Sequence, residues 1–465
     1  MFSNLSFSDT QSPSQNGIRG AGHLAQSTAS DAPPPSAGTP GDGRGLPVPG
    51  RWLGVGLLTV IYVLNYMDRQ ILAILIEPIK ADIALTDTQV GLLTGTLFAV
   101  FYSIITIPVA MLADRMNRIW IIAIGCFLWS CFTGLSGLAV TFLALAIARI
   151  GVAFGEAGGV APSLSILGDY FTPRRRVIAI SLFTCASPMG IMAGAMAGGL
   201  ISAEYGWRAV FYFAAILGII AAPLLIWLAP EPPRGNYEKD APGRPLSLPA
   251  TVALFFRLPT LGWMALSCGF FAMIANGLIT WMPAVLMRVY GASGQDIALY
   301  YGPVIGISLM IGLFSSGAII SWFAQRSLRA FAIVPAIAML LCAPLFALAL
   351  TADTWQMVLL WSFVPIALIN FVVPPALTLV QNLAPPEARS TASAVLMLVL
   401  NLVGIGLGPL VVGMASDYFS REMGDDGLRY AMIISLVPIM ILTAITLFIA
   451  ATTVVRDHER VAAPV

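Results

Sequence analysis

Long runs of apolar residues recur along the chain from residue 52 to residue 452, separated by short polar stretches. A run of about 20 residues is long enough, as an α-helix, to cross the roughly 30 Å hydrocarbon layer of a membrane. The runs do not alternate apolar and polar residues, as the strands of a membrane barrel would. The pattern therefore predicts an all-α polytopic membrane protein.

The runs divide into twelve predicted spans, with ends placed to within several residues. They are residues 52–77, 90–113, 119–140, 142–168, 177–201, 207–229, 260–287, 297–323, 330–350, 355–381, 391–413 and 428–452. A polar, Pro-rich stretch, APEPPRGNYEKDAPGRP, separates six spans from six. The predicted organisation is a cytoplasmic tail (1–48), an N-terminal six-helix bundle (49–229), a cytoplasmic linker (230–258), a C-terminal six-helix bundle (259–452) and a second cytoplasmic tail (453–465).

The first 48 residues are rich in Ser, Gly, Pro and Ala and contain few bulky apolar side chains. Such a composition cannot bury enough surface to form a core, so we expect disorder there. The segment also lacks the apolar region of a signal peptide.

The composition agrees with a membrane protein, since 58% of the residues are hydrophobic and only 10% are charged. A soluble domain carries about 25% charged residues. The net charge of +1 gives no basic face for nucleic acid. Because both histidines, His23 and His458, lie in the tails, metal binding and histidine catalysis are not expected. The five cysteines lie in apolar runs without metal-ligand spacing, and we interpret them as packing residues.

Lys and Arg predict the orientation, because they concentrate in cytoplasmic loops. With a cytoplasmic N-terminus, the inner loops hold most of them, including Arg51, Arg115, Arg118, Arg174, Arg175, Arg176, Arg234, Lys239, Arg257, Arg326, Arg329 and Arg389. The outer loops hold only Lys80, Arg208, Arg288, Arg421 and Arg429. We therefore expect both termini to be cytoplasmic and the protein to lie in the plasma (inner) membrane.

The two halves of the chain also repeat. LADRMNR (112–118) aligns with FAQRSLR (323–329), TPRRRVIAIS (172–181) with PPEARSTAS (385–393), and YGWRAVF with DGLRYAM. Three matches in the same order indicate a duplicated six-helix unit. Such repeats build transporters whose binding site lies between the repeats near the middle of the membrane.

Four charged residues lie within the spans, away from their ends: Asp68, Arg69, Arg149 and Glu156. Each costs about 2.5–3.5 kcal/mol on insertion scales, so each needs a partner or a water-filled cavity. Counting residues places Asp68 and Arg149 at a similar depth, about 14 Å and 12 Å from the outer end. Glu156 lies nearly two turns deeper on the face of Arg149. A cluster whose pairing changes with conformation can take up and release a proton. The alternative is a static clamp between Asp68 and Arg149.

The last six spans carry no comparable charge. The span at 355–381 has none, and the span at 260–287 offers only Asn276, Thr280 and Trp281 near its middle. A cavity with one charged wall and one apolar wall suits an amphipathic substrate. Alternatively, the uncharged span packs against its neighbours and touches no substrate.

The loop ADRMNR resembles the signature of the major facilitator superfamily, with Ala110 and Asn117 in place of two glycines. The resemblance implies two pseudo-symmetric bundles and a loop that locks the cytoplasmic side. The expected gate residues are Asp114, Arg115, Arg118, Asp169, Arg326 and Arg329.

NYMDRQ (65–70), ARIGVAFGEAGGVAPS and SPMG…GG…YGWRAVF resemble the spinster-like subfamily. This resemblance implies proton-coupled transport of a lysolipid or sphingolipid-like anion. The expected proton-coupling residues are Asp68 and Glu156; the expected substrate-binding residues are Tyr66, Arg69, Arg149, Glu156, Asn276, Thr280 and Trp281. Anion:cation symporters share the N-Y-x-D-R stretch. A symporter for a small organic carboxylate is therefore an alternative function, and a multidrug exporter is another.

A receptor or a multispan enzyme is a third class, but the membrane acids lack a nucleophile partner and no enzyme is expected. The sequence has no Walker motif, which leaves an ATP-driven pump without support. We expect no cofactor and a monomer whose partners are membrane lipids, protons and a small amphipathic substrate.

Overall fold

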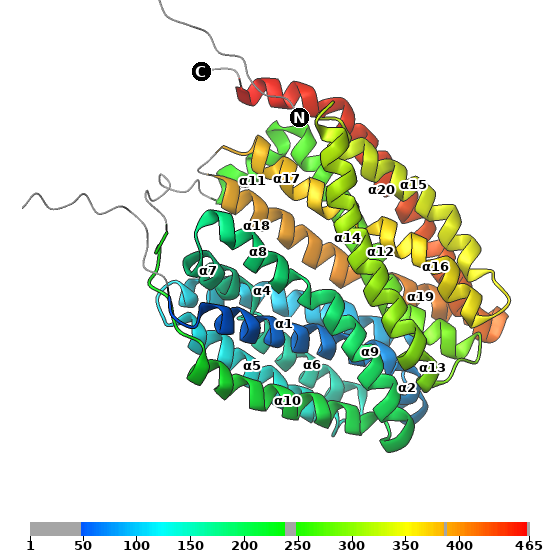
Figure 1. The fold of residues 1–465 in the computed structure, drawn as a ribbon. Coiled ribbons are helices and arrows are strands. Elements are labelled where there is room, and N and C mark those ends of the chain that lie inside the picture. Colours follow the sequence, from blue (N-terminus) through cyan, green and yellow to red (C-terminus); the bar gives the residue numbers. More distant parts are fainter. Residues whose placement is uncertain (1–47, 238–247, 386–387, 463–465) are drawn as a thin grey trace, which may run out of the picture. The chain divides into compact units, whose positions relative to one another are not determined.

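The computed structural model describes residues 48–237, 248–385 and 388–462, and these ranges are overwhelmingly helical (Figure 1). The predicted disordered tail lies outside the described residues except for Val48. Within these described ranges, eleven helical segments are long and apolar enough to cross a membrane. The last of them has 71 residues and contains two helices separated at Gly424–Asp426, which supplies the twelfth span. The prediction of an all-α polytopic membrane fold is confirmed.

The first six spans consist of ten helices and one π-helical turn. They are α1 (Arg51–Ile74) with α2 (Ile76–Ile83); α3 (Asp87–Gly91), η1 (Leu92–Thr96) and α4 (Leu97–Ala113); α5 (Arg118–Ser136); α6 (Phe142–Glu156) with α7 (Val160–Tyr170); α8 (Pro173–Thr184) with α9 (Ala186–Tyr205); and α10 (Trp207–Leu228).

The last six spans follow α11 (Leu248–Arg257), a short helix in the predicted linker. They are α12 (Pro259–Arg288); α13 (Gly294–Asp296), η2 (Ile297–Tyr301) and α14 (Gly302–Ala324); α15 (Ala330–Leu350); α16 (Trp355–Ile369) with α17 (Val373–Leu383); α18 (Arg389–Val399), η4 (Leu400–Ile405) and α19 (Gly406–Met423); and α20 (Gly427–Ala462). Helix α20 continues ten residues past the predicted end of its span.

The sequence repeat reappears in the way the helices begin. Thr86 and Ser293 each form a capping box at the start of the second span of their half. Thr141 and Thr354 each accept a hydrogen bond from a backbone N–H three residues later, at the start of the fourth span. These caps satisfy backbone donors that a helix start leaves free. Corresponding spans of the two halves therefore begin at corresponding capping residues.

Glycines bring α9 directly against α1. A methyl group added at Gly190 would lie 2.5 Å from the carbonyl oxygen of Val63, and one at Gly194 would lie 2.7 Å from that of Met67. No side chain fits at such a distance, so the two backbones touch. Gly190 and Gly194 therefore form a packing face of small residues.

We call the end of the spans that carries residues 84–86, 206, 289–293 and 424–426 the outer end, following the charge-based orientation. The two halves approach closely there. An added methyl group at Gly91 would lie 2.7 Å from the carbonyl oxygen of Pro409, and one at Gly199 would lie 2.2 Å from that of Gly294. Helix α3 thus contacts α19, and α9 contacts the start of the eighth span.

Candidate functional site

Two of the predicted membrane charges form an ion pair. Asp68 lies on α1 and Arg149 on α6, and Arg149 Nη1 is 3.0 Å from Asp68 Oδ2. Both residues are 2% exposed. The prediction that they share a level in the membrane is therefore confirmed. Burial of both charges is tolerable because each neutralises the other.

The other two charges form a second pair, which the sequence analysis did not predict. Glu156 Oε2 lies 2.8 Å from Arg69 Nε and 2.7 Å from Arg69 Nη2. Glu156 is the last residue of α6, directly before the interruption at residues 157–159. Adjacent residues of α1 point about 100° apart. Asp68 and Arg69 can therefore reach two positions on α6 that are almost two turns apart.

Thr133 is a further member of the cluster that sequence reasoning missed. Its hydroxyl, on α5, donates a 2.6 Å hydrogen bond to Asp68 Oδ1. Thr133 is 1% exposed. A threonine in an apolar span carries no signal of such a role in the sequence, because most threonines in helices bond to their own backbone.

Aromatic rings surround Arg69. Its guanidinium carbon lies 5.5 Å from the ring centre of Tyr66, 4.6 Å from that of Phe98 and 5.4 Å from that of Tyr102. The Arg69 side chain is 23% exposed, whereas that of Arg149 is 3% exposed. Arg69 is therefore the more accessible cation, held over apolar rings that can also contact a hydrocarbon chain.

Some buried polar atoms of the cluster have no hydrogen-bond partner among the described residues. They are Glu156 Oε1, Arg149 Nε and, one turn away on α1, Asn65 Oδ1. Both oxygens of Asp68, in contrast, accept hydrogen bonds. Unpartnered buried atoms are rare because they cost free energy. Glu156 therefore retains an oxygen that can receive a proton without the loss of an existing contact.

Among the described residues, the predicted substrate residues of the last six spans form no hydrogen bond or ion pair with this charged cluster. Asn276 donates to the carbonyl oxygen of Ala272 on its own helix, at 2.8 Å. Trp281 is fully buried and donates to the carbonyl oxygen of Pro409 at 2.9 Å. Thr280 is 7% exposed. In this conformation Trp281 joins α12 to α19, so contact with a substrate would require a different packing.

At the inner end, Arg118 organises a compact polar cluster. Its Nη1 lies 2.5 Å from Asp169 Oδ2, and its Nε lies 2.8 Å from Glu231 Oε1 in the linker. Two of the expected gate residues, Arg118 and Asp169, thus pair with each other. Arg234 of the linker donates to the carbonyl oxygens of Ala113 and Met116. These contacts tie the linker to the first six spans.

The other predicted gate residues do not join the halves here. Arg326 and Arg329 form no ion pair within the part of the chain that the structure describes. Arg326 instead lies over the ring of Trp322, 4.3 Å from its centre. Asp114 and Arg115 are exposed.

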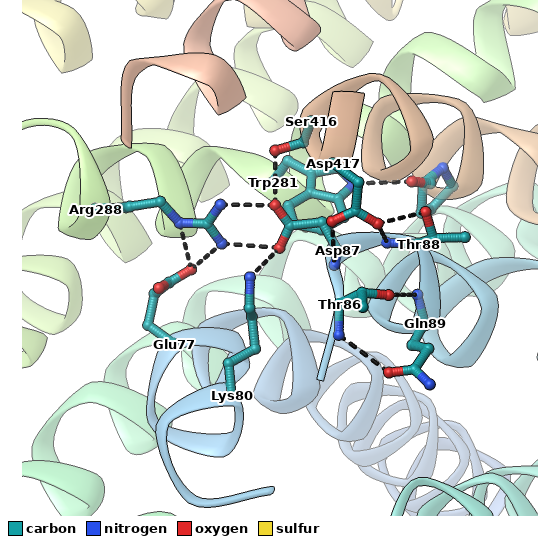
Figure 2. A network of polar contacts seen from close by, with 11 residues as sticks. Glu77, Lys80, Thr86, Asp87, Thr88, Gln89, Trp281, Arg288, Ser416 and Asp417 are labelled. Atoms are coloured by element: carbon teal, nitrogen blue, oxygen red, sulfur yellow. Dashed lines mark hydrogen bonds and ion pairs between the residues drawn. The ribbon is translucent and has the colours of Figure 1, made fainter. Parts of the chain in front are cut away.

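An ion-pair network joins the halves at the outer end (Figure 2). Arg288, at the end of α12, donates to both oxygens of Asp87, at 2.7 and 2.9 Å. The same guanidinium contacts Glu77 Oε1 on α2 at 2.7 Å. Lys80, also on α2, contacts Asp87 from the other side. We call these residues, with Ser416 and Asp417, the outer latch.

Helix α19 completes the outer latch (Figure 2). Ser416 donates to Asp87 Oδ2 at 2.6 Å. The Asp417 carboxylate accepts hydrogen bonds from the backbone N–H groups of Asp87 and Thr88, at 2.9 and 2.8 Å. An acid is favourable there because the first N–H groups of a helix are unpaired and carry partial positive charge. In the sequence, Lys80 and Arg288 are outer-loop charges and the other residues of the outer latch have no predicted role, because only the fold brings the four segments together.

The charged contacts between the two halves differ between the outer end and the inner end. Charged side chains bind the halves to each other at the outer end, while Arg326 and Arg329 make no ion pair to the described residues of the first half at the inner end. With the predicted orientation, the outer end is therefore held closed in this structure, as an inward-facing state requires.

The chain is similar in sequence to known membrane proteins. A family model described as Major Facilitator Superfamily matches residues 58–409. An "MFS-type efflux pump" from Mycolicibacterium smegmatis is 30% identical over 410 residues, which cover 87% of this chain and 94% of that protein. "Protein spinster homolog 1" from Xenopus tropicalis is 28% identical over 402 residues, which cover 81% of this chain and 76% of that protein.

The fold is similar to that of solved structures. A bacterial homologue of the human lysosomal transporter spinster, in an inward-facing and unoccupied conformation, aligns with a TM-score of 0.75 at 29% identity. The alignment covers 90% of this chain and 99% of that one. A mutant of the nucleoside transporter NupG aligns with a TM-score of 0.69 at 13% identity, over 85% of this chain and 99% of that one, which supports the fold alone.

Proposed function

The chain belongs to the major facilitator superfamily and resembles its spinster-like transporters, and we propose that it carries an amphipathic anion together with a proton by alternating access. The observation that supports this most directly is the pairing of Glu156 with the partly exposed Arg69. The anion class is a lysolipid or sphingolipid-like molecule.

The Arg69–Glu156 pair suggests how proton and anion are coupled. An anionic headgroup and Glu156 compete for the same guanidinium, which offers paired donors to carboxylate or phosphate. If the headgroup binds Arg69, Glu156 is left as a buried, unpaired carboxylate. Such a charge is costly, so the group takes up a proton instead. Proton and anion then bind together, and both are released together when Arg69 and Glu156 pair again.

The rings around Arg69 support an amphipathic substrate over a hydrophilic one. Phe98, Tyr66 and Tyr102 place aromatic surface beside the most accessible charge of the cluster. Helix α16 of the opposite half carries no charged residue. A hydrocarbon chain is compatible with both surfaces, whereas a sugar acid would leave its hydroxyl groups unpaired.

The test uses the purified full-length protein in liposomes, with a fluorescent anionic lysolipid and an imposed pH gradient. We expect the gradient to accelerate lysolipid transport, and a protonophore to remove the acceleration. Transport that ignores the gradient would contradict proton coupling. Gradient-driven uptake of a small organic carboxylate, without lysolipid transport, would favour the anion:cation symporter instead.

Arg69→Ala is expected to weaken binding of the anionic lysolipid by about 10- to 100-fold, because a charge-assisted hydrogen bond contributes about 1.5–3 kcal/mol. Arg69→Lys should weaken it less, since an ammonium keeps the charge but loses the paired donors. Thermal shift and a fluorescence binding titration measure this. Arg149→Lys is the matched comparison at the buried arginine. Unchanged affinity in Arg69→Ala would show that Arg69 does not bind the headgroup.

We propose that Asp114 and the cluster around Arg118 act in closing the inner end. Asp114→Ala is expected to shift the population toward inward-facing states by about 1–2 kcal/mol, the scale of a helix-end charge in a favourable geometry. Spin labels at the exposed positions Met116 and Ser327 would report the distance across the inner end. An unchanged distance distribution with reduced transport would assign Asp114 to folding instead.

The distribution of Lys and Arg supports cytoplasmic termini and insertion in the plasma membrane. We propose that the protein works as a monomer, because the charged cluster is built from one chain.

A further inference from the structure

We infer that Thr133 is a positioning residue that holds Asp68 in its ionised form against Arg149, so that the coupling proton is taken by Glu156. The inference rests on the proposed proton coupling. It assigns a different role to each acid: Asp68 stays paired with Arg149, and Glu156 takes up the proton.

The direction of the Thr133 hydroxyl is the first observation. On the same helix, Ser130 and Ser136 donate to the carbonyl oxygens of Cys126 and Phe132, four residues earlier. This is the usual bond of a hydroxyl in an apolar helix. Thr133 instead donates across to α1, at 2.6 Å from Asp68 Oδ1. The hydroxyl is thus used to bind a carboxylate on another helix.

The contrast between the two acids is the second observation. Asp68 accepts from Thr133 on one oxygen and from Arg149 on the other. Glu156 accepts from Arg69 on Oε2 only, and its Oε1 has no partner among the described residues. A proton on Asp68 would remove one of two hydrogen bonds, whereas a proton on Glu156 Oε1 removes none. Donors to a carboxylate favour its charged form.

Among the described residues, the groups around Asp68 include no second neutral donor in the place of Thr133 and no other acid beside Glu156 that could take the proton. The charged groups beside Asp68 are Arg149 and Glu156 on α6 and Arg69, the next residue of α1. Tyr66 on α1 and Tyr102 on α4 lie around Arg69, Tyr62 contacts Tyr66, and α5 also carries the thiols of Cys126 and Cys131. Helices α9 and α10 pack against α1, and their titratable residues, Glu204, Tyr205, Arg208 and Tyr212, lie toward the outer end. Thr133 is therefore the neutral donor that distinguishes Asp68 from Glu156.

The test is the pH profile of lysolipid transport in liposomes for Thr133→Val and Thr133→Ser. Valine keeps the size but has no hydroxyl, so Asp68 Oδ1 loses its hydrogen bond and Arg149 alone holds the carboxylate. We expect the pH of half-maximal transport to rise by about one unit, the scale of one hydrogen bond to a charged group. Thr133→Ser should restore the wild-type profile. Thr443→Val is the control, because Thr443 is equally buried but donates to its own backbone.

A spectroscopic measurement locates the proton even if Thr133→Val does not fold. Infrared difference spectra of the purified full-length protein, recorded through the transport pH range, show the band of a protonated carboxyl group. The band should disappear in Glu156→Gln and persist in Asp68→Asn. The reverse result, or a Thr133→Val profile equal to that of the wild type, would overturn the inference.

The proposed function and this inference fail differently. Wild-type transport that does not change with the pH gradient would contradict both the proposed proton coupling and the role of Thr133. A wild-type protein driven by the gradient, with an unchanged Thr133→Val profile, would overturn only the role of Thr133.

Discussion

Replacing Glu156 by Gln is expected to abolish gradient-driven transport while leaving exchange of substrate across the membrane measurable. A carboxamide has nearly the size of a carboxyl group but cannot carry a proton. A proton gradient equivalent to 100 mV supplies about 2.3 kcal/mol per proton. That energy supports roughly 50-fold accumulation, since about 1.4 kcal/mol corresponds to a factor of ten. We expect the variant to reach equal concentrations on both sides instead.

The measurement compares two assays in the same liposomes: accumulation under an imposed pH gradient, and exchange with substrate on both sides and no gradient. Glu204→Gln is the matched control, because Glu204 is exposed near the outer end and away from the cluster. It should accumulate substrate like the wild type. Accumulation by Glu156→Gln at the wild-type level would rule out Glu156 as the proton carrier.

Arg288→Gln is expected to shift the protein toward outward-facing states. The substitution leaves Glu77 without this partner and removes two of the contacts to Asp87. Loss of one partner of a fully buried pair costs about 3–5 kcal/mol. Because the Arg288 and Glu77 side chains are 10% and 25% exposed, and Lys80 still neutralises Asp87, we expect about 2 kcal/mol, roughly a 30-fold change in population.

Spin labels at the exposed positions Glu204 and Asp425, one in each half, would measure this shift at the outer end, in a background without the native cysteines. Arg208→Gln is the control. Arg208 pairs with Asp82 at 2.6 Å on the same end of the molecule, but both residues belong to the first six spans. The distance should lengthen in Arg288→Gln and stay unchanged in Arg208→Gln. Equal distributions in both variants would show that the outer latch does not hold the halves together.

The sequence by itself determined the architecture. The apolar runs are long enough, as helices, to cross the hydrocarbon layer of a bilayer, and so many of them cannot be covered by a water-exposed surface. The helical spans therefore follow from composition and length alone. The repeat is equally local, because residues such as Thr141 and Thr354 cap the helices that they begin. The sequence also identified the residues of the charged cluster. An ionisable residue inside a span costs free energy, so it is expected only where it has a partner or a functional role.

The tertiary structure decided which partner each charge has. Spacing along α6 placed Glu156 on the face of Arg149, yet Glu156 pairs with Arg69, because rotation and tilt of two packed helices fix which side chains meet. Neither quantity can be read from periodicity.

The outer latch shows the same limit more strongly. Asp87 and Arg288 lie 201 residues apart, and Asp87 and Ser416 lie 329 apart. In the sequence each is a charged or polar residue near the end of a span. Their contact depends on which end of the molecule is closed, a property of the conformation that no local pattern encodes.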